Sequence, residues 1–283
     1  MDLSIIVPLY YGKKYIPKLT NMLEKNIKVA KKYSIEVIFV NDSPDEIINE
    51  NLFKRYSNFK LITNEKNLGI QRARIKGINN ACGDKILMLD QDDLLSSDAI
   101  KSQLECIKDS DAVLANGFVQ LSNGRLKSLY GSFAQQELAN SLKYYLYYGN
   151  MVASPGLVII KKNIIPNAWL NNYLTISGAD DWLLWAGFIA NGNSFKMNRK
   201  KIYTHINVGS NFSSNEKRMI ESSFEALKIL KQNNKINSRE FRLHNRRLKM
   251  RKEILENPKG KYKEYLKNPD VAWNMLIYKL YAI

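Results

Sequence analysis

Three carboxylates crowd into four residues at 90–93, Asp-Gln-Asp-Asp, directly after the apolar run 85–89. Carboxylates this close repel one another unless a cation or hydrogen-bond donors neutralise them. Because oxygen ligands suit hard cations, the segment could hold Mg²⁺ or Mn²⁺. The alternative is a helix N-terminus, where acidic side chains satisfy free backbone amides. The Ser-Ser-Asp run at 96–98 could serve as that cap, which would leave residues 90–93 for a metal.

A second acidic pair, Asp180 and Asp181, stands at the start of the apolar stretch 182–190. A carboxylate there could act as a general base towards a hydroxyl nucleophile. Taken alone, the pattern favours a helix N-cap instead. His205 is one of 2 histidines in the chain, and it gains meaning as a ligand only if it shares a metal with the acidic segment.

Two arginines, Arg72 and Arg74, fall on the first turns of a helix expected at 70–82. Guanidinium groups suit bidentate contacts to phosphate, whereas the plain alternative is a pair of solvated surface residues. The sequence contains neither G-x-G-x-x-G nor G-x-x-x-x-G-K-[ST]. A dinucleotide-binding or P-loop protein therefore lacks its main motif here.

The elements that must position these residues alternate between strand and helix in the first third of the chain. Such alternation predicts a mostly parallel α/β sheet flanked by helices. In a sheet of this kind, ligands bind beyond the carboxyl ends of the strands, which selects residues 10–11, 41–42 and 90–93. The expected strands span 4–9, 36–40, 59–62 and 85–89, and the expected helices span 16–27 and 70–82.

The order loosens after the acidic segment. The pattern predicts strands at 111–115, 118–121 and 156–160, helices at 134–148 and 180–190, and helix from 215 almost to the end. We expect one α/β domain over residues 1–214 and a helical, basic C-terminal extension over 215–283.

Charge is distributed unevenly. The chain has 43 Lys+Arg against 27 Asp+Glu, a net charge of +16, which suggests a polyanionic partner. Residues 215–283 hold 17 basic and 8 acidic side chains, so they carry +9 of that excess. The segment 239–252 is the most basic part, and it predicts either attachment to an anionic membrane face or a solvated helix face. Nucleic-acid binding is disfavoured, because no nucleic-acid-binding module is recognisable.

The chain lacks a continuous charge-free window of transmembrane length and a signal-peptide pattern, and it has 2 cysteines. We therefore expect a cytoplasmic protein, peripheral on the inner membrane face if the basic extension binds lipid.

Five segments together resemble family-2 glycosyltransferases with the GT-A fold. They are Ser-Ile-Ile-Val-Pro-Leu-Tyr at 4–10, Val-Asn-Asp-Ser at 40–43, Asn-Leu-Gly at 67–69 with Ala-Arg at 73–74 and Gly77, Leu-Asp-Gln-Asp-Asp at 89–93, and Asp-Asp-Trp-Leu-Leu-Trp at 180–185. Each segment is weak alone, but five in order at plausible spacing over residues 3–210 form a strong joint signal.

The resemblance implies a transferase that moves a sugar from a nucleotide diphosphate donor to an acceptor hydroxyl with inversion. Asp42 matches the carboxylate that reads the nucleotide base, and Pro8 and Tyr10 line that pocket. Arg74 matches a contact to the base or the diphosphate. The donor is expected to be a UDP-sugar, and the acceptor a saccharide or lipid-linked saccharide of a bacterial surface polysaccharide.

The same resemblance assigns the acidic residues. Asp90 and Asp92 match the two acids of the D-x-D motif, which contact the ribose and a divalent metal, Mn²⁺ or Mg²⁺; Gln91 lies between them in the donor site. Asp93 supports either role, and His205 resembles a late metal-contacting histidine. Asp181 matches the second acid of the family's Glu-Asp pair, usually the catalytic base. Asp180 stands where the family has Glu, so the choice between the two aspartates stays open.

A sugar nucleotidyltransferase is the enzymatic alternative, since it shares an α/β sheet and metal-binding acids. That class needs a glycine-rich segment after the first strand, and residues 10–14 contain Gly12 alone. A basic nucleic-acid-binding protein is the alternative outside enzymes.

Overall fold

The computed structural model describes residues 1–53, 56–206 and 215–282. Contacts divide the chain into two compact units. The first contains Met1–Leu129, Ala153–Ile165 and the strand that begins at Phe195; the second contains Tyr130–Val152, Pro166–Ser194 and the described residues from 215 onward. The expected boundary between residues 214 and 215 adjoins a segment outside the described residues, so that division stays a prediction.

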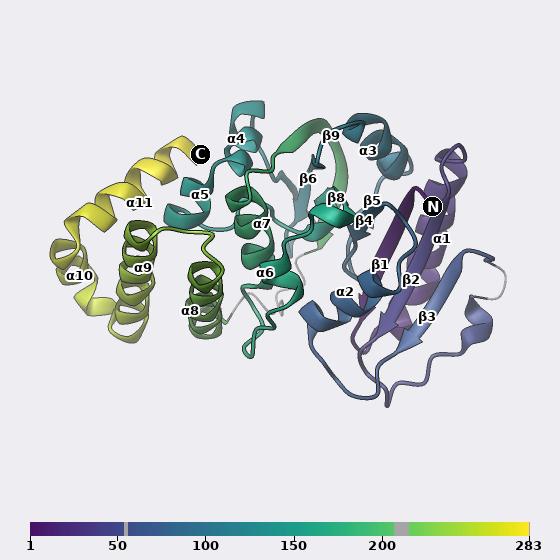
Figure 1. Ribbon diagram of the computed structural model, residues 1–283, viewed down its shortest axis with the longest axis horizontal. Helices are drawn as coiled ribbons and strands as arrows, with labels where there is room; N and C mark the ends of the chain where they lie inside the picture. The colour runs from purple at the N-terminus through teal and green to yellow at the C-terminus, as the bar shows by residue number, and fades with distance from the viewer. Residues whose placement is uncertain (54–55, 207–214, 283) are drawn as a thin grey trace. The chain divides into compact units, whose positions relative to one another are not determined.

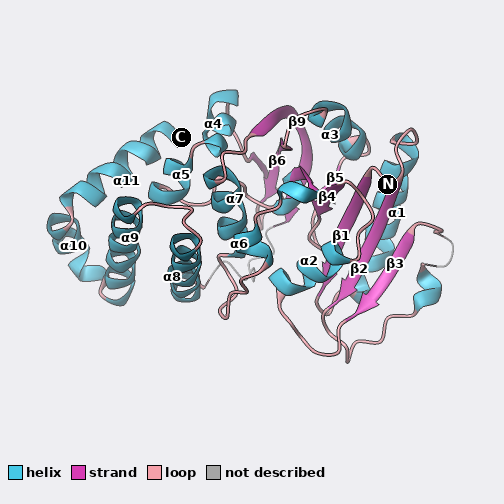
Figure 2. Ribbon diagram, in the orientation of Figure 1, coloured by secondary structure: helices cyan, strands magenta, loops and turns pink. Residues whose placement is uncertain are grey.

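The first unit is built on one sheet, drawn in magenta in Figure 2. Over the described residues its strand order is β3-β2-β1-β4-β8-β6-β9-β5, with β7 paired to β6. Every residue of β1 and β2 is buried, which explains why both strands are near-continuous apolar runs. The first four strands are mutually parallel and are β1 (Leu3–Leu9), β2 (Ile35–Asn41), β3 (Phe59–Thr63) and β4 (Lys85–Met88).

The other half of the sheet mixes directions. β8 (Val158–Lys161) runs antiparallel between β4 and β6 (Ala112–Gln120), and β9 (Phe195–Ile206) pairs parallel with β6. β5 (Leu94–Leu95) and β7 (Leu126–Ser128) add short antiparallel pairings. The two strands expected at 111–115 and 118–121 are one strand, β6, whose register against β9 shifts at Asn116.

Over its described residues this unit has the helices α1 (Ile16–Val29), α2 (Ile70–Asn79) and α3 (Ala99–Ile107). α1 buries Ile16, Leu19 and Leu23, as the sequence spacing predicts. α2 packs closely on β1 and β2, where a Cβ at Gly77 would come within 2.4 Å of Ile6 Cγ2. Glycine is therefore required for this helix to approach the sheet.

The second unit is helical (Figure 1). α7 is buried from Trp182 to Ile189 and packs against α5, α6 and α8, whereas α9 packs against α5 and α8. The helix expected at 134–148 is two helices, because a short 3-10 turn at Leu138–Asn140 separates them. The helices are α4 (Phe133–Glu137), α5 (Leu142–Tyr147), α6 (Asn167–Leu170), α7 (Asp180–Ala190), α8 (Glu216–Gln232), α9 (Ser238–Glu256), α10 (Lys261–Lys267) and α11 (Pro269–Ala282).

The prediction of an α/β sheet flanked by helices, followed by helices at the C-terminus, is confirmed. Among the described residues, none of the helices is both long and apolar enough to cross a membrane. Further 3-10 turns in the described ranges span Lys13–Tyr15, Glu50–Leu52, Pro155–Leu157, Lys162–Ile164 and Pro258–Gly260.

Candidate active site

The acidic segment 90–93 lies at the carboxyl end of β4, between that strand and β5. It does not begin a helix. The next helix, α3, starts at Ala99, and its N-cap is Asp98, to which Ser96 Oγ donates a hydrogen bond of 2.9 Å. The helix-cap explanation of residues 90–93 is therefore wrong.

Asp90 is neutralised by a buried arginine. Arg74 Nη2, from α2, donates to Asp90 Oδ1 at 2.6 Å, and the Arg74 side chain is only 3% exposed. A guanidinium placed so deep requires a carboxylate partner. Arg74 thus acts first on Asp90, so any contact that it makes with a donor would be shared with this ion pair.

Asp93 is sequestered in the protein. Its Oδ1 accepts hydrogen bonds from Ile206 N and from the Nδ1 of His205, both at 3.0 Å, and its Oδ2 accepts one from the hydroxyl of Tyr203. All three partners come from β9, so this carboxylate ties the acidic segment to that strand. Asp93 in this arrangement positions His205. The expected role of Asp93 as a metal ligand stays a prediction.

The pKa values of two partners of Asp93, Tyr203 and His205, are shifted towards the protonated forms that donate hydrogen bonds. Burial, and then the charges of Asp93 and Asp90, raise the pKa of Tyr203 well above its usual value, so its hydroxyl stays protonated. The hydrogen bond with Asp93 raises the pKa of His205 against the opposing effect of burial. Because Asp93 engages Nδ1, a metal would have to coordinate His205 through Nε2.

Asp92 differs from its two neighbours. Burial and then the negative charges of Asp93 and Asp90 raise the pKa of its carboxyl. Among the described residues no basic side chain forms an ion pair with Asp92. A carboxylate held among like charges is the group that gains most from a cation.

The residues fit a divalent metal bound in part by its substrate. No group of three or more His, Cys, Asp and Glu that could enclose an ion exists in the described part of the chain. Mg²⁺ in phosphate-handling enzymes is typically held by one or two protein side chains together with phosphates and water, so a full cage is not needed. Asp92, with His205 near enough to offset part of the rise in its pKa, would supply that kind of partial site.

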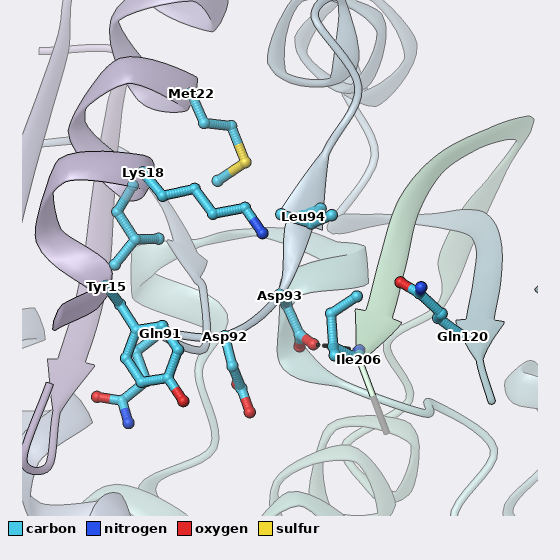
Figure 3. A pocket seen from close by; sticks show the side chains of 10 residues that line it. Tyr15, Lys18, Met22, Gln91, Asp92, Asp93, Leu94, Gln120 and Ile206 are labelled. Carbon is cyan, nitrogen blue, oxygen red and sulfur yellow. Dashed lines mark hydrogen bonds between the residues drawn. The ribbon is translucent and has the colours of Figure 1, made fainter. Parts of the chain in front are cut away.

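A pocket of about 200 Å³ opens beside the acidic segment (Figure 3). Asp92 and Asp93 line it from one side, and Figure 3 shows the Lys18 amine of α1 reaching over it near Leu94. Sites for whole small molecules usually exceed 300 Å³, so this pocket would take only part of a donor. The sequence did not single out three of its polar lining residues, namely Tyr15, Lys18 and Gln120.

Asp42 follows β2 and is buried. Its Oδ1 accepts hydrogen bonds from Asn64 Nδ2 and Leu68 N, and its Oδ2 accepts one from Gly69 N, each at 2.8 Å. Gly69 has φ +82°, which favours glycine at the start of α2. A carboxylate has about four lone-pair positions, so about one remains for a nucleotide base.

The loop after β1 carries exposed aromatic rings. Tyr10 and Tyr11 stand edge to face with ring centroids 4.8 Å apart, whereas Pro8 is buried within β1. Gln91 clamps this loop to the acidic segment: its Oε1 accepts from Tyr10 N at 2.9 Å, and its Nε2 donates to Tyr10 O at 3.1 Å. Gln91 therefore positions Tyr10, whatever it contacts in a donor.

Tyr11 has a left-handed backbone, with φ +44°. Its N–H donates to Ser43 Oγ at 3.0 Å, and its hydroxyl donates to Asp45 at 2.8 Å. Strained residues of this kind persist where surrounding contacts hold them, and they cluster at ligand sites.

The second acidic pair lies in the other unit, in the first turn of α7. The N-cap of α7 is Ala179, so neither Asp180 nor Asp181 is the capping residue. Asp180 is buried and Asp181 is half-buried. The following Trp182 is fixed by its Nε1, which donates to Tyr145 O at 2.8 Å, and by His244, whose ring stacks on it at 5.1 Å.

Comparison with known proteins bears on this site. The family model described as "Glycosyl transferase family 2" matches residues 4–165, more than half of the chain. The chain belongs to glycosyl transferase family 2. The match takes in the ends of β1, β2 and β4, and hence Asp42, Arg74 and residues 90–93. It ends before α7 and β9, so the roles of Asp181 and His205 rest on their motifs alone.

A solved structure of another protein has a fold similar to that of this chain. The crystal structure of S. aureus TarS residues 1–349 in complex with UDP-GlcNAc is similar, with a TM-score of 0.63, 19% identity and coverage of 89% of this chain and 72% of that one. This likeness confirms the predicted GT-A-like fold.

Two relatives match by sequence over shorter stretches. An uncharacterized glycosyltransferase of Haemophilus influenzae is 31% identical over 133 residues, which cover 44% of this chain and 51% of that protein. The minor teichoic acid biosynthesis protein GgaB of Bacillus subtilis is 36% identical over 107 residues, which cover 36% of this chain and 12% of that protein. The aligned region thus spans about half of the first relative and a small part of the second.

Proposed function

We propose that this protein transfers a sugar from a nucleotide diphosphate sugar, a UDP-sugar, to a hydroxyl of a saccharide or lipid-linked saccharide, with inversion, in bacterial surface polysaccharide synthesis. The observation that carries the proposal is Asp92, a carboxylate at the end of β4 in a family-2 fold that forms no ion pair with a Lys or Arg among the described residues. The UDP-GlcNAc complex of TarS supports the donor class, and the teichoic acid role in the name of GgaB supports the pathway.

The donor half of the site follows from the ends of β1, β2 and β4. Asp42 accepts a hydrogen bond from the nucleotide base with its remaining lone pair, beside Pro8 and the exposed ring of Tyr10. Asp90 accepts from the ribose while Arg74 balances its charge. Gln91 keeps the two loops in register by its paired bonds to Tyr10.

Asp92 would hold the divalent metal, with His205 as a second ligand set in orientation by Asp93. When bound, the metal stabilises the negative charge that develops on the leaving diphosphate. The protein holds Asp92 in place through the short loop between β4 and β5, whose far end is fixed by the contacts of Asp93 with β9.

Asp181 is the proposed general base, which takes the proton from the acceptor hydroxyl. It is the more exposed of the two aspartates in α7, and a base must reach its substrate. Such help contributes about two to four orders of magnitude in rate. Single displacement needs no covalent nucleophile, so the aspartate and the metal-assisted leaving group suffice.

The test is a screen of nucleotide sugars with Mn²⁺ that scores release of nucleoside diphosphate. We expect one donor to be consumed, and we expect Asp181→Asn to keep donor binding while losing most transfer. Asp180→Asn is the matched control and should retain more activity. Full turnover in Asp181→Asn would reject it as the base, and the absence of release from every donor would count against the transferase.

A further inference from the structure

α11 is apolar on two opposite faces. Val271 and Tyr278, seven residues apart, lie on the inner face; Val271 is buried, and the Tyr278 ring packs against Tyr144 at 4.8 Å and Tyr147 at 4.9 Å of α5. A helix that is apolar all round is normally covered on all sides. The contacts with α5 account for one side only.

The opposite face is open to solvent. Trp273, Leu276 and Leu280 follow at spacings of three and four, which places them in one stripe along the helix. We call these three residues the outer stripe; they are 63%, 48% and 66% exposed. The preceding helix, α10, adds Tyr262 and Leu266, which are 79% and 81% exposed. Exposed apolar stripes of this kind mark interaction surfaces.

The surroundings of the outer stripe are positively charged. Both acids of α10 and α11 are already paired: Glu264 with Lys267 at 2.5 Å, and Asp270 with Arg246 at 2.8 Å. The other exposed lysines of this region have no ion pair among the described residues. They are Lys259, Lys261, Lys263 and Lys279.

We propose that the outer stripe docks onto an anionic lipid surface, with α11 lying in the plane of the interface. Trp and Leu on one face with Lys nearby is the composition of interfacial helices, and Trp favours the headgroup level. α11 has 14 residues and so reaches about 21 Å, short of a hydrocarbon core of about 30 Å. It lies on the membrane and does not span it.

Charge also decides against a second copy of this chain as the occupant. Two such surfaces brought together would oppose lysine to lysine, whereas anionic headgroups attract every one of them. The inference goes beyond the proposed transfer and does not depend on it.

The experiment uses the full chain and two kinds of vesicle, phosphatidylglycerol mixed with phosphatidylcholine, and phosphatidylcholine alone. Trp273 is the exposed one of the 4 tryptophans, because Trp169, Trp182 and Trp185 are buried. Its fluorescence should shift to the blue on the anionic vesicles and be quenched by brominated lipid. An unchanged spectrum on those vesicles would overturn the proposal.

Flotation assays then compare two sets of substitutions. Trp273→Ser with Leu276→Ser and Leu280→Ser should lower partition onto anionic vesicles on the order of a hundredfold. Ile47→Ser with Leu126→Ser, at exposed apolar positions of the sheet unit, is the control and should leave partition unchanged. Changing Lys261, Lys263 and Lys279 to Gln should lower it about fivefold for each lysine.

Two further outcomes decide the matter. Equal partition of the triple Ser variant and the wild type would overturn the proposal. So would a dimer seen by light scattering that the triple variant abolishes while vesicle binding is absent, because the stripe would then pair with a second copy. Should the triple variant unfold, Leu280→Ser alone, checked by its thermal unfolding, replaces it and should lower partition severalfold.

Discussion

Two runs of like charge stand out in this chain, the acidic segment 90–93 and the basic segment 239–252, and the fold handles them differently. In the acidic segment, Asp90 is paired with Arg74 and Asp93 with residues of β9, whereas Asp92 forms no ion pair with a Lys or Arg in the part of the chain that the structure describes. The neighbours of the loop thus engage two of its carboxylates and leave the third for the cation that we propose.

The basic segment, most of α9, has several of its charges engaged within the protein, whereas Arg239, Arg242 and Lys249 are exposed. Arg246 forms a bidentate pair with Asp270, and Arg251 pairs with Glu216 at 3.1 Å. Arg247 is buried and donates to the backbone carbonyls at residues 146 and 148, where it caps the C-terminal end of α5. The number of like charges in a sequence therefore does not tell which of them a partner can reach.

The largest expected effect separates Asp92 from Asp93. If Asp92 holds the proposed metal, Asp92→Asn should reduce sugar transfer about a thousandfold, because a metal that stabilises a leaving group contributes several kcal/mol. Its thermal stability should hold or rise, since burial and then like charges already disfavour the ionised form. Kinetics with Mn²⁺ and thermal unfolding measure the two quantities.

Asp93→Asn is the matched control for that substitution. It removes the same charge but replaces one acceptor oxygen by a donor amide, so either Tyr203 or the pair His205 and Ile206 loses its acceptor, and the free energy of unfolding should fall by about 2–3 kcal/mol. If both variants lose stability equally, the distinction between an open and a sequestered carboxylate is wrong.

The ion pair of Arg74 gives the next largest effect. Arg74→Ala leaves Asp90 next to two further carboxylates, and breaking a buried pair costs about 3 kcal/mol or more in unfolding free energy. Arg72→Ala, two residues away on the exposed side of α2, should change it by less than about 0.5 kcal/mol. Denaturant unfolding distinguishes the two, and similar losses would show that Asp90 does not depend on Arg74.

Sequence reasoning reached the parallel half of the sheet because β1 and β2 are buried on both faces and so read as apolar runs. β9 was missed: its residues include Lys196, Arg199, Lys200 and Lys201, and no apolar run or strict alternation announces a strand. Pairing with β6 stabilises it, and that long-range contact is invisible to a local pattern.

The candidate site, too, could be predicted only in part from the sequence. Residue types and strand ends were enough to select Asp42, Arg74 and residues 90–93. They did not reveal that Asp42 supports the turn into α2, that Gln91 clamps Tyr10, or that Tyr203 donates to Asp93. Those roles depend on which side chains meet across the sheet, and sequence spacing alone does not specify them.

In the basic segment, Arg247 is buried and Lys249 is exposed, so their substitution should affect stability differently. Arg247→Met removes two charge-assisted hydrogen bonds, one to Tyr148 O and one to Leu146 O, which His244 also contacts, at a cost of about 3 kcal/mol in unfolding free energy. Lys249→Met, on the exposed side of α9, should cost less than about 0.5 kcal/mol. Equal stability of the two variants would indicate that the whole segment is a solvated helix face.

The smallest effect concerns the buried histidine of the same segment. Burial, and then the positive charges of Arg247 and Arg251, lower the pKa of His244 to about 3, against an ordinary value of 6.5. The folded state therefore holds His244 neutral, and its contribution to stability is complete above pH 6.5 and is lost as the pH falls towards 3. Each pH unit within that window costs about 1.4 kcal/mol, or about 2 kcal/mol between pH 6.5 and pH 5.

His244→Phe, which keeps a ring against Trp182, should be less stable than the wild type at pH 8 because Leu146 O loses a donor. Its unfolding free energy should nevertheless fall less steeply with acid, and denaturant titrations at pH 8, 6.5 and 5 compare the slopes. Parallel pH dependence in the two proteins would mean that His244 is not held neutral by its burial between α9 and Trp182. The difference between buried and exposed basic groups of α9 would then have no effect on how stability depends on pH.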